Sequence, residues 1–195
     1  GSARAILAGE RTALNFLQRM SGIATATRRM VDAAGRDAQI ADTRKTAPGL
    51  RAFDKYAVRI GGGTNHRTGL YDAVLIKDNH WRLVGGVGPA VRRARQVLSG
   101  GGAKAPPIEV EVSTLAEVEE AIAAGADQLL LDNMDRAGLE RAVRAARGRA
   151  FLEVSGRVRE EDVPGLSRLG IDRISVGMLT HSVRAADIAL EIEAQ

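Results

Sequence analysis

The 195-residue sequence contains no cysteine, few aromatic residues and no long hydrophobic run. Without cysteine, disulfide bonds and thiolate-based metal or redox chemistry are excluded. Aromatic residues make up only 3% of the chain, which leaves little surface on which nucleic-acid bases could stack. No apolar run approaches the roughly 20 residues that a membrane-spanning helix needs, and no signal-peptide pattern opens the chain. A cytoplasmic protein is therefore the default expectation.

The apolar residues that are present are mostly aliphatic. They make up most of a hydrophobic fraction of 45%, which suits helices packed on a parallel sheet better than an all-β sandwich. The length is sufficient for one substantial core, or for a domain with a fragment of another. Because the sequence starts at Gly1 and leads almost at once into a helical pattern, we expect it to be part of a longer protein.

The charge balance is basic, with a formal net charge of +4, which can indicate a nucleic-acid partner. Cations and anions are interspersed along most of the chain, however, and stacking residues are scarce, so we expect no such partner. The exception is segment 41–81, which holds seven cations, three consecutive glycines and two of the three histidines. This segment predicts a site for small polyanions such as phosphorylated compounds.

Six short apolar runs alternate with stretches of helical periodicity. The runs occupy residues 38–41, 73–76, 108–112, 128–131, 150–154 and 173–176. Their nearly continuous apolar character predicts strands that are covered on both faces. Helices are predicted at 114–124 and 135–148, each with a polar start and a glycine at its end. Residues 1–35 form a leading helical region, which we expect to be broken near Ser21-Gly22, and residues 36–195 form the βα repeats.

Polar residues follow each of the predicted strands. They are Thr43-Arg44-Lys45, residues 77–80, Glu111, Asp132-Asn133, Ser155-Gly156 and Gly177. Polar residues at every strand end, instead of at one crevice, favour a barrel with its site at the carboxyl ends of the strands over a doubly wound sheet. Since eight strands would be needed for closure, we predict an incomplete TIM-like α/β barrel of six to seven parallel strands.

The cations of segment 41–81 have two interpretations. Arg44 and Lys45 would point in opposite directions on an extended chain, so both reach one ligand only if the chain turns there. The alternative is an exposed basic loop. The run Gly61-Gly62-Gly63 resembles a backbone nest for an anion, with Arg67 as a clamp, although the same run could be a flexible loop. Lys77 ends a buried strand and could be a Schiff-base nucleophile or an anion clamp; the nearby arginines favour the clamp.

Two further groups of residues could support chemistry. Glu109 and Glu111 share one side of a strand and Asp132 ends the next one, so they could bind Mg²⁺ or sugar hydroxyls, or act as acid and base. The alternative for this pair is one buried carboxylate that pairs with a core cation. The ends of the last two strands and residues 180–182 could form a phosphate site. The three histidines share no metal-like spacing, so we expect no histidine metal site.

Several separate motifs together resemble the quinolinate phosphoribosyltransferase family, the decarboxylating type II phosphoribosyltransferases. Among them are Thr43-Arg44-Lys45-Thr46 and Leu75-Ile76-Lys77-Asp78-Asn79-His80. The full set lies in order at residues 10–15, 21–25, 43–49, 55–56, 61–67, 75–80, 109–112, 131–133 and 176–181. The resemblance implies an incomplete α/β barrel, usually preceded by a smaller α/β domain that this sequence lacks. It also implies a homodimer, with an arginine donated to the neighbour's site, and transfer from 5-phosphoribosyl 1-pyrophosphate to quinolinate.

Carried onto the matching positions, the resemblance implies two sets of binding residues. The quinolinate carboxylates would be bound by Arg44, His66, Arg67 and Lys77, with Arg11 from the partner subunit. The phosphoribosyl pyrophosphate would be bound by Lys45, Glu111, Asp132, Ser155, Gly156, Gly177 and His181. Lys45, Lys77, Glu111 and Asp132 would take part in catalysis. Mg²⁺ would be held mainly through the pyrophosphate of the substrate, with Glu111 and Asp132 as candidate protein ligands.

The chain departs from the family at Arg157, where Gly or Asn usually follows Ser155-Gly156. Its side chain would either crowd the phosphate cradle or add a phosphate contact. Three alternatives to the implied activity stay open: a nicotinate phosphoribosyltransferase, the barrel-sharing protein associated with molybdate transport, and a non-catalytic binding barrel. Release of carbon dioxide together with pyrophosphate would separate the first two from quinolinate turnover, and ligand binding without turnover would indicate the third.

Overall fold

The computed structural model describes residues 1–100 and 105–193. Its strands form one all-parallel, six-stranded sheet in the order β1-β6-β5-β4-β3-β2. The strands are β1 (Gln39–Ala41), β2 (Val74–Ile76), β3 (Ile108–Val112), β4 (Gln128–Asp132), β5 (Phe151–Ser155) and β6 (Arg173–Ser175). The six predicted runs are therefore strands, and the parallel βα architecture of an incomplete TIM-like barrel is confirmed.

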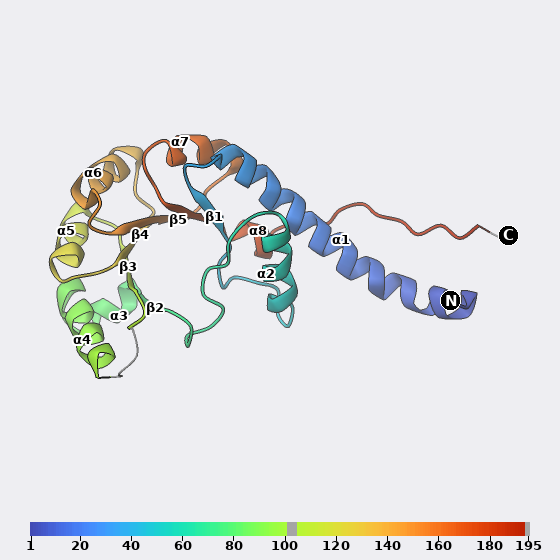
Figure 1. Ribbon diagram of the computed structural model, residues 1–195, viewed down its shortest axis with the longest axis horizontal. Helices are drawn as coiled ribbons and strands as arrows, with labels where there is room; N and C mark the ends of the chain where they lie inside the picture. The colour runs from blue at the N-terminus through green and yellow to red at the C-terminus, as the bar shows by residue number, and fades with distance from the viewer. Residues whose placement is uncertain (101–104, 194–195) are drawn as a thin grey trace.

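The helices cover the convex face of this curved sheet (Figure 1). They are α1 (Ala3–Ala34), α2 (Arg51–Ile60), α3 (Asp78–Arg82), α4 (Val87–Ser99), α5 (Leu115–Ala123), α6 (Arg136–Ala146), the short 3₁₀ helix η1 (Glu160–Asp162), α7 (Val163–Ser167) and α8 (Met178–His181). The starts predicted for α5 and α6 are confirmed, because Thr114 and Asp135 accept backbone N–H hydrogen bonds as caps. None of the described helices is long and apolar enough to cross a membrane.

The two faces of the sheet differ in chemistry. The face that packs under the helices is aliphatic and buried, and it includes Ile108, Val110, Leu129, Leu131 and Ile174. The alternate residues of the same strands pair in register to form two rows on the concave face. One row contains Glu111, Leu130, Glu153 and Arg173, and the next contains Asp132, Ser155 and Ser175. The sequence predicted strands with apolar cover on both faces, but polar and apolar residues alternate along these strands. The interior of the barrel is therefore polar.

The barrel is open between β1 and β2, the two outer strands of the sheet. The connection from α2 to β2 passes through this opening (Figure 1). It begins by pairing with β1, through a single parallel bridge between Ala41 and Thr64. Residues 64–67 therefore lie where a further strand would lie in a closed barrel, and they bring His66 and Arg67 to the interior.

The predicted break in the leading helix is wrong, because α1 runs without interruption from Ala3 to Ala34. Gly22 is buried against the segment that follows α8, and a β-carbon at Gly22 would lie 2.3 Å from the carbonyl oxygen of Arg184. The C-terminal segment is also hydrogen-bonded to α1, since Gln18 donates to the carbonyl of Ile188 at 2.7 Å. The glycine therefore permits close packing of two segments and does not end the helix.

We expect Gly22→Ala to destabilise the protein, although alanine is the better helix former. Elsewhere in a helix the change is favourable by about 0.5–1 kcal/mol, but here the new methyl group overlaps a backbone oxygen, and overpacking of this kind costs about 1–3 kcal/mol. Thermal unfolding measures the difference. Gly9→Ala is the matched control, because it lies in the same helix with open space around it. Equal stabilisation by both substitutions would contradict the packing of residues 184–185 on α1.

Candidate active site

A cavity of about 520 Å³ opens at the carboxyl ends of the strands. Four cationic side chains from three separate segments border it: Arg44, Lys45, Arg67 and Lys77. His66, Glu153, Ser155 and Ser175 also contribute to its wall. The structure thus brings together the cations that the sequence placed after β1, after the triple glycine and after β2. In a parallel βα barrel, this end of the sheet is where functional groups converge.

The turn that Arg44 and Lys45 require is present after β1. The backbone N–H of Lys45 donates to Oγ1 of Thr43 at 3.0 Å, and that of Thr46 donates to the carbonyl of Arg44 at 3.0 Å. The Oγ1 of Thr180, a fully buried residue of α8, donates to the carbonyl of Lys45 at 2.7 Å. Because the chain turns here, both neighbouring cations border the same cavity. The alternative of a purely exposed basic loop is therefore not what the structure shows.

Arg44 and Arg67 leave uncompensated charge at this cavity. Burial lowers the pKa of Arg67, and repulsion from the neighbouring guanidinium of Arg44 lowers it further. The Nε of Arg44 is buried and has no hydrogen-bond partner in the part of the chain that the structure describes. A buried donor without a partner costs free energy, and so do two like charges that face each other. An anion bound between these side chains would relieve both costs.

Three of the seven cations in segment 41–81 do not border the cavity. Lys55 is buried in an ion pair with Asp42 at 2.5 Å. Arg51 donates to Oγ1 of Thr46 and to the carbonyls of Arg44 and Thr68, at 3.1 Å each, and so ties two loops together. Arg59 is exposed on α2. The number of cations in the segment therefore overstates the charge that is available to a ligand.

The interpretation of the triple glycine as an anion nest is wrong. The amide groups of Gly61, Gly62 and Gly63 donate to the carbonyls of residues 57, 59 and 58, so none of them is free for an anion. A β-carbon at Gly61 would lie 2.5 Å from the carbonyl oxygen of Ala24, and one at Gly63 would lie 2.8 Å from Cγ2 of Thr27. The glycines therefore allow the turn to pack directly on α1.

His66 belongs to a buried cluster of four charged groups below the cavity. Its Nε2 lies 3.2 Å from Glu109 and 3.4 Å from Glu153. The guanidinium of Arg173 pairs with both carboxylates, at 3.1 Å for Glu109. This confirms the alternative considered for Glu109, a buried carboxylate paired with a core cation. Glu153 and Arg173 were missed by the sequence interpretation, although a single charged residue inside an apolar strand such as Phe151–Ser155 is a signal for such a pair.

The protonation of His66 follows from the charges that surround it. Burial would lower its pKa, but the hydrogen bonds to Glu109 and Glu153 outweigh burial and raise the pKa to about 9. The amide of Arg67 donates to Nδ1 at 2.7 Å, which favours the neutral ring. The two carboxylates favour the imidazolium, because they are then matched by two cations. The charged ring carries a proton on Nδ1 as well, so it cannot keep the hydrogen bond from Arg67. His66, Glu109 and Glu153 are close enough to hold a metal ion, but Arg173 already supplies the compensating charge.

This pairing predicts a loss of stability at alkaline pH. The pKa of about 9 in the folded protein lies above the ordinary value of 6.5. The charged ring therefore contributes fully below pH 6.5, and its contribution is lost as the pH rises through about 9. The full contribution is on the order of 3 kcal/mol. We expect the melting temperature to fall more steeply over this range for the native protein than for His66→Gln; parallel curves would contradict the assignment.

The carboxylates at the ends of β3 and β4 lie at the mouth of the barrel. Lys77 donates to Oε2 of Glu111 at 2.9 Å. Asp132 accepts hydrogen bonds from the hydroxyl of Ser155 at 3.2 Å and from the side chain of Asn133 at 2.8 Å. Asn133 has a positive φ of 51°, which is uncommon for a residue other than glycine. These contacts fix both carboxylates and leave Lys77 hydrogen-bonded to one of them.

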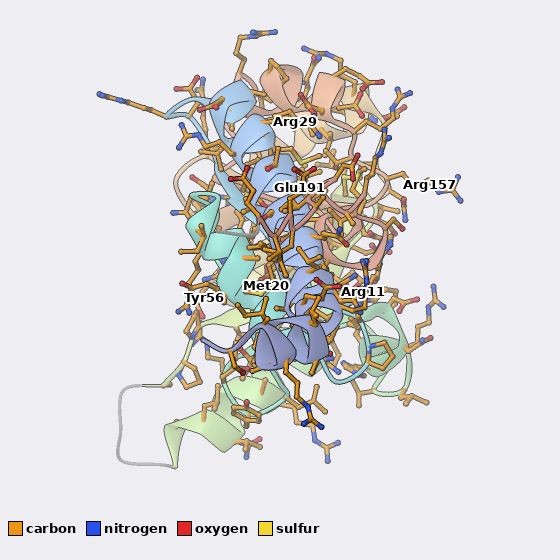
Figure 2. All side chains as sticks on the ribbon, turned by 90° about the vertical axis from the view of Figure 1, so that its right-hand side faces the viewer. Arg11, Met20, Arg29, Tyr56, Arg157 and Glu191 are labelled. Atoms are coloured by element: carbon orange, nitrogen blue, oxygen red, sulfur yellow. The ribbon has the colours of Figure 1, made fainter. Side chains whose placement is uncertain are left out.

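The residues predicted to form a phosphate cradle lie in two neighbouring places. A β-carbon at Gly177 would lie 3.1 Å from Nε2 of His181 and 3.5 Å from Cδ of Lys45, so these three residues are in close contact. Ser155 and Gly156 border a hollow of about 610 Å³ next to Asn133. Arg157 is exposed and projects from the edge of the molecule (Figure 2), and it borders the same hollow as Ser155 and Gly156.

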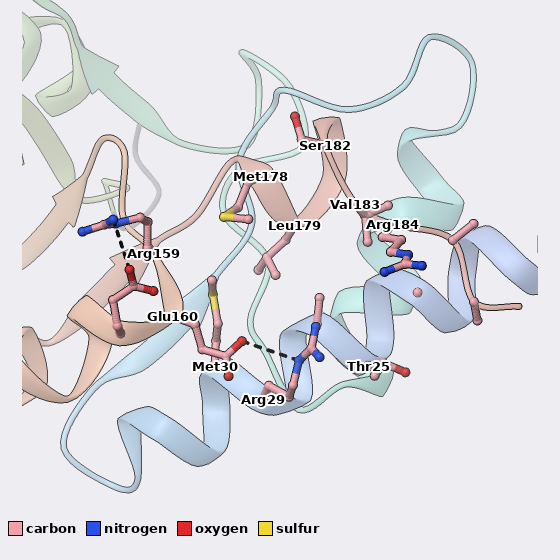
Figure 3. Close-up of a pocket in the computed structure, with 15 residues that line it drawn as sticks. Thr25, Arg29, Met30, Arg159, Glu160, Met178, Leu179, Ser182, Val183 and Arg184 are labelled. Atoms are coloured by element: carbon pink, nitrogen blue, oxygen red, sulfur yellow. Dashed lines mark ion pairs between the residues drawn. The ribbon is translucent and has the colours of Figure 1, made fainter.

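Arg11 is the one predicted quinolinate-binding residue that does not border the cavity. It is exposed on the part of α1 that projects beyond the barrel (Figures 1 and 2). A further hollow of about 540 Å³ lies between α1, η1 and the segment after α8, and of the residues predicted for a binding site only Ser182 borders it (Figure 3). Arg29 and Glu160 form an ion pair of 3.5 Å within it. The predicted chemistry therefore belongs to the mouth of the barrel.

Comparisons with known proteins match this chain over nearly its whole length. The family model for the quinolinate phosphoribosyl transferase C-terminal domain matches residues 23–191. A mitochondrial quinolinate phosphoribosyltransferase (decarboxylating, form 2a) of Nicotiana tabacum is 46% identical, over 100% of this chain and 59% of that protein. A probable nicotinate-nucleotide pyrophosphorylase (carboxylating) of Bacillus subtilis is 44% identical, over 98% of this chain and 65% of that protein.

The fold agrees with these sequence relationships. The solved structure of the nicotinate-nucleotide pyrophosphorylase from Francisella tularensis superposes with a TM-score of 0.88 at 46% identity, covering 95% of this chain and 65% of that one. The chain thus spans less than two thirds of the length of these relatives. The family model, the sequence identities and the shared fold lead to one conclusion. The chain belongs to the family of the quinolinate phosphoribosyl transferase C-terminal domain.

Proposed function

We propose that this chain is the catalytic barrel of an enzyme that transfers the phosphoribosyl group of 5-phosphoribosyl 1-pyrophosphate to quinolinate. The reaction removes one carboxylate and yields nicotinate mononucleotide, pyrophosphate and carbon dioxide, as a step of NAD biosynthesis. The observation that supports it most is the convergence of Arg44, Lys45, Arg67 and Lys77 on one cavity. Both substrates are polyanions, and their combined charge matches this cavity.

The two carboxylates of quinolinate would bind to Arg44, Arg67 and Lys77. Among the described residues, the buried Nε of Arg44 has no hydrogen-bond partner, and an arginine fork fits a carboxylate in a bidentate manner. His66 would add positive charge below the ligand, because its Nε2 pairs with the carboxylates of Glu109 and Glu153. Arg11 would come from a second copy of the chain, since it lies outside the cavity of its own chain.

The phosphoribosyl pyrophosphate would lie beside quinolinate. Lys45, Gly177 and His181 would face its 5′-phosphate or pyrophosphate, together with Ser155 and Gly156. Glu111 and Asp132 would bind the ribose hydroxyls at the ends of β3 and β4. Each carboxylate already accepts a hydrogen bond from a side chain of the protein. We therefore propose that Mg²⁺ is held mainly by the pyrophosphate, with Glu111 and Asp132 as supporting oxygen ligands, and that it neutralises charge on the leaving group.

The chemistry follows from where the charges lie. As the bond from C1 of the ribose to pyrophosphate breaks, positive charge develops on the sugar ring, and Glu111 and Asp132 stabilise that charge. The cations around the cavity stabilise the negative charge that develops on the leaving group. The quinolinate nitrogen forms the new bond to C1 and becomes cationic. Its positive charge then stabilises the electron pair that stays on C2 when the adjacent carboxylate leaves as carbon dioxide. A proton from water bonds to this pair and gives the C2–H of the product, so the reaction needs no covalent nucleophile.

A coupled assay tests this function. Quinolinate labelled in its 2-carboxylate is incubated with phosphoribosyl pyrophosphate, Mg²⁺ and the longest native form of the protein, and labelled carbon dioxide and pyrophosphate are measured together. We expect equal amounts of the two products, and no turnover with nicotinate. Turnover of nicotinate would indicate the related nicotinate phosphoribosyltransferase activity. Quinolinate binding without either product would indicate a non-catalytic barrel.

A homodimer is part of the proposal. The projecting part of α1 exposes Leu7 and Leu17. Among the described aromatic residues, Phe16 packs only against Phe53 of α2, with ring centroids 5.1 Å apart. Exposed apolar side chains next to Arg11 are typical of a surface that a second copy of the chain covers. Sedimentation of the native protein tests it, and a monomer at assay concentrations would contradict it. A cytoplasmic location stays a prediction, and the names of plant relatives specify mitochondria or chloroplasts.

A further inference from the structure

A buried carboxylate lies between the two loops that supply the arginines of the cavity. Asp42 follows β1 directly, precedes Thr43 and Arg44 in the sequence, and has 0% of its surface exposed. Burial raises the pKa of Asp42, although the hydrogen bond from Lys55 and its positive charge oppose this shift. Asp42 does not border the cavity, so a direct contact with a ligand there does not explain why a charged group is buried at this position.

Asp42 is hydrogen-bonded mainly to the loop that carries His66 and Arg67. Its Oδ1 accepts from the backbone N–H of His66 at 2.9 Å and from Nζ of Lys55 at 2.5 Å. Its Oδ2 accepts from the side-chain amide of Asn65 at 2.6 Å. The carboxylate of Asp42 therefore attaches residues 65 and 66 to the end of β1. Arg44 lies two positions after Asp42 in the sequence.

Lys55 completes the attachment from α2. Lys55 is 5% exposed, and besides Asp42 its side chain donates to the carbonyl of His66 at 2.7 Å. The side chain of Asn65 in turn donates to the carbonyl of Lys55 at 2.9 Å. Both backbone polar groups of His66 are thus bound by one ion pair, and this ion pair is closed off from solvent.

The ion pair of Asp42 and Lys55 lies where β1, at the edge of the described sheet, lacks a neighbouring strand. Backbone pairing between β1 and the loop ends at Thr64, whose N–H donates to Ile40 and whose carbonyl accepts from Asp42. Beyond Thr64, the ladder hydrogen bonds that a neighbouring strand would supply are absent from the described structure. Arg44 and Arg67 repel each other across this same place. Arg51 ties the loop to Arg44, and the side chain of His66 pairs with Glu109 and Glu153. The ion pair of Asp42 and Lys55 is the attachment that holds the backbone of His66 against this repulsion.

We propose that Asp42 and Lys55 are positioning residues, which replace the missing ladder bonds and hold the loop of His66 and Arg67 beside Arg44 before any anion binds. The identity of that anion as quinolinate rests on the proposed function. The preformed arrangement lowers the cost of ligand binding, because the two arginines do not have to be brought together when the ligand arrives. An ion pair at this place can act without touching the ligand, since small displacements of a binding group weaken binding strongly.

The test uses a double variant, Asp42→Asn with Lys55→Met, in the longest native form of the protein. Either single change leaves one buried charge without its partner and is expected to destabilise the fold, whereas the double change removes both charges together. The matched control is Asp127→Asn with Arg95→Met. It removes an ion pair of 2.6 Å near the amino ends of β3 and β4 and changes the net charge equally.

We expect the double variant to fold, with a KM for quinolinate raised by about tenfold or more. The KM for phosphoribosyl pyrophosphate and the kcat should change much less, and the control should match the native protein. Hydrogen exchange gives a second readout that does not depend on turnover: the amide of His66 should exchange much faster in the variant, with core amides unchanged.

The proposal is overturned if the folded double variant keeps both the native KM for quinolinate and the native protection of the His66 amide. It is also overturned if the control raises the KM as much as the double variant does. If the native protein itself does not turn over quinolinate, the proposed function fails, and the exchange of the His66 amide still decides whether Asp42 and Lys55 hold the loop.

Discussion

Replacing Arg67 with alanine is expected to raise the KM for quinolinate by about 100-fold. Among the described residues that border the cavity, Arg67 is the only arginine from the loop in the barrel opening. A charge-assisted hydrogen bond contributes about 1.5–3 kcal/mol, and a bidentate arginine makes two of them to one carboxylate. Loss of the pair therefore corresponds to about two orders of magnitude in affinity. Steady-state kinetics with varied quinolinate measures the effect.

Two further variants show whether the geometry or only the charge of Arg67 matters. Arg67→Lys keeps the charge but loses the planar fork, so we expect it to recover only part of the affinity. Arg59→Ala removes an equal charge from an exposed position on α2 and should leave the KM unchanged. Near-normal kinetics for Arg67→Ala would contradict its role in carboxylate binding.

Replacing Asp132 with asparagine is expected to lower kcat by about 10²–10³-fold while the KM for quinolinate changes little. Removal of one group that stabilises transition-state charge typically has an effect of this size. The substitution preserves the shape of a side chain that accepts hydrogen bonds from Ser155 and Asn133, but it removes the negative charge opposite the developing positive charge on the ribose. Single-turnover kinetics would place the loss in the transfer step.

Asp127→Asn is the matched control for Asp132→Asn. Asp127 lies just before β4 and Asp132 at its end, so the same chemical change is made at opposite ends of one strand. We expect kcat of the Asp127 variant to stay near the native value. A kcat within about threefold of native for Asp132→Asn would contradict the catalytic role of Asp132, because such a change corresponds to less than 1 kcal/mol.

The architecture and the ligand-facing cations could be predicted because they depend on local patterns. Short aliphatic runs separated by helical periodicity lead to parallel strands, and the chain then has to present the residues after each strand at one end of the sheet. Arg44 and Lys45 lie shortly after β1 and Lys77 lies directly after β2, so their convergence follows from topology alone. Arg67 converges too, but its place depends on the loop in the barrel opening, which no periodic pattern specifies.

The predictions that failed depend on contacts between distant segments. The Ser21-Gly22 pair has the composition of a helix break, yet its glycine accommodates the backbone of Arg184. The triple glycine has the composition of an anion nest, yet it packs on α1. Lys55 was counted among the seven cations of segment 41–81, because the sequence gives no sign that Asp42 is its partner. In each case the residue type was informative, but its partner lies elsewhere in the chain and only the fold identifies it.

A crystal structure of the native protein with quinolinate bound would locate the substrate carboxylates. We expect the two carboxylates to lie within about 3 Å of donor nitrogens of Arg44, Arg67 and Lys77, in the cavity at the carboxyl ends of the strands. Quinolinate bound at another place, with Arg44 and Arg67 turned away from it, would contradict the proposed binding site.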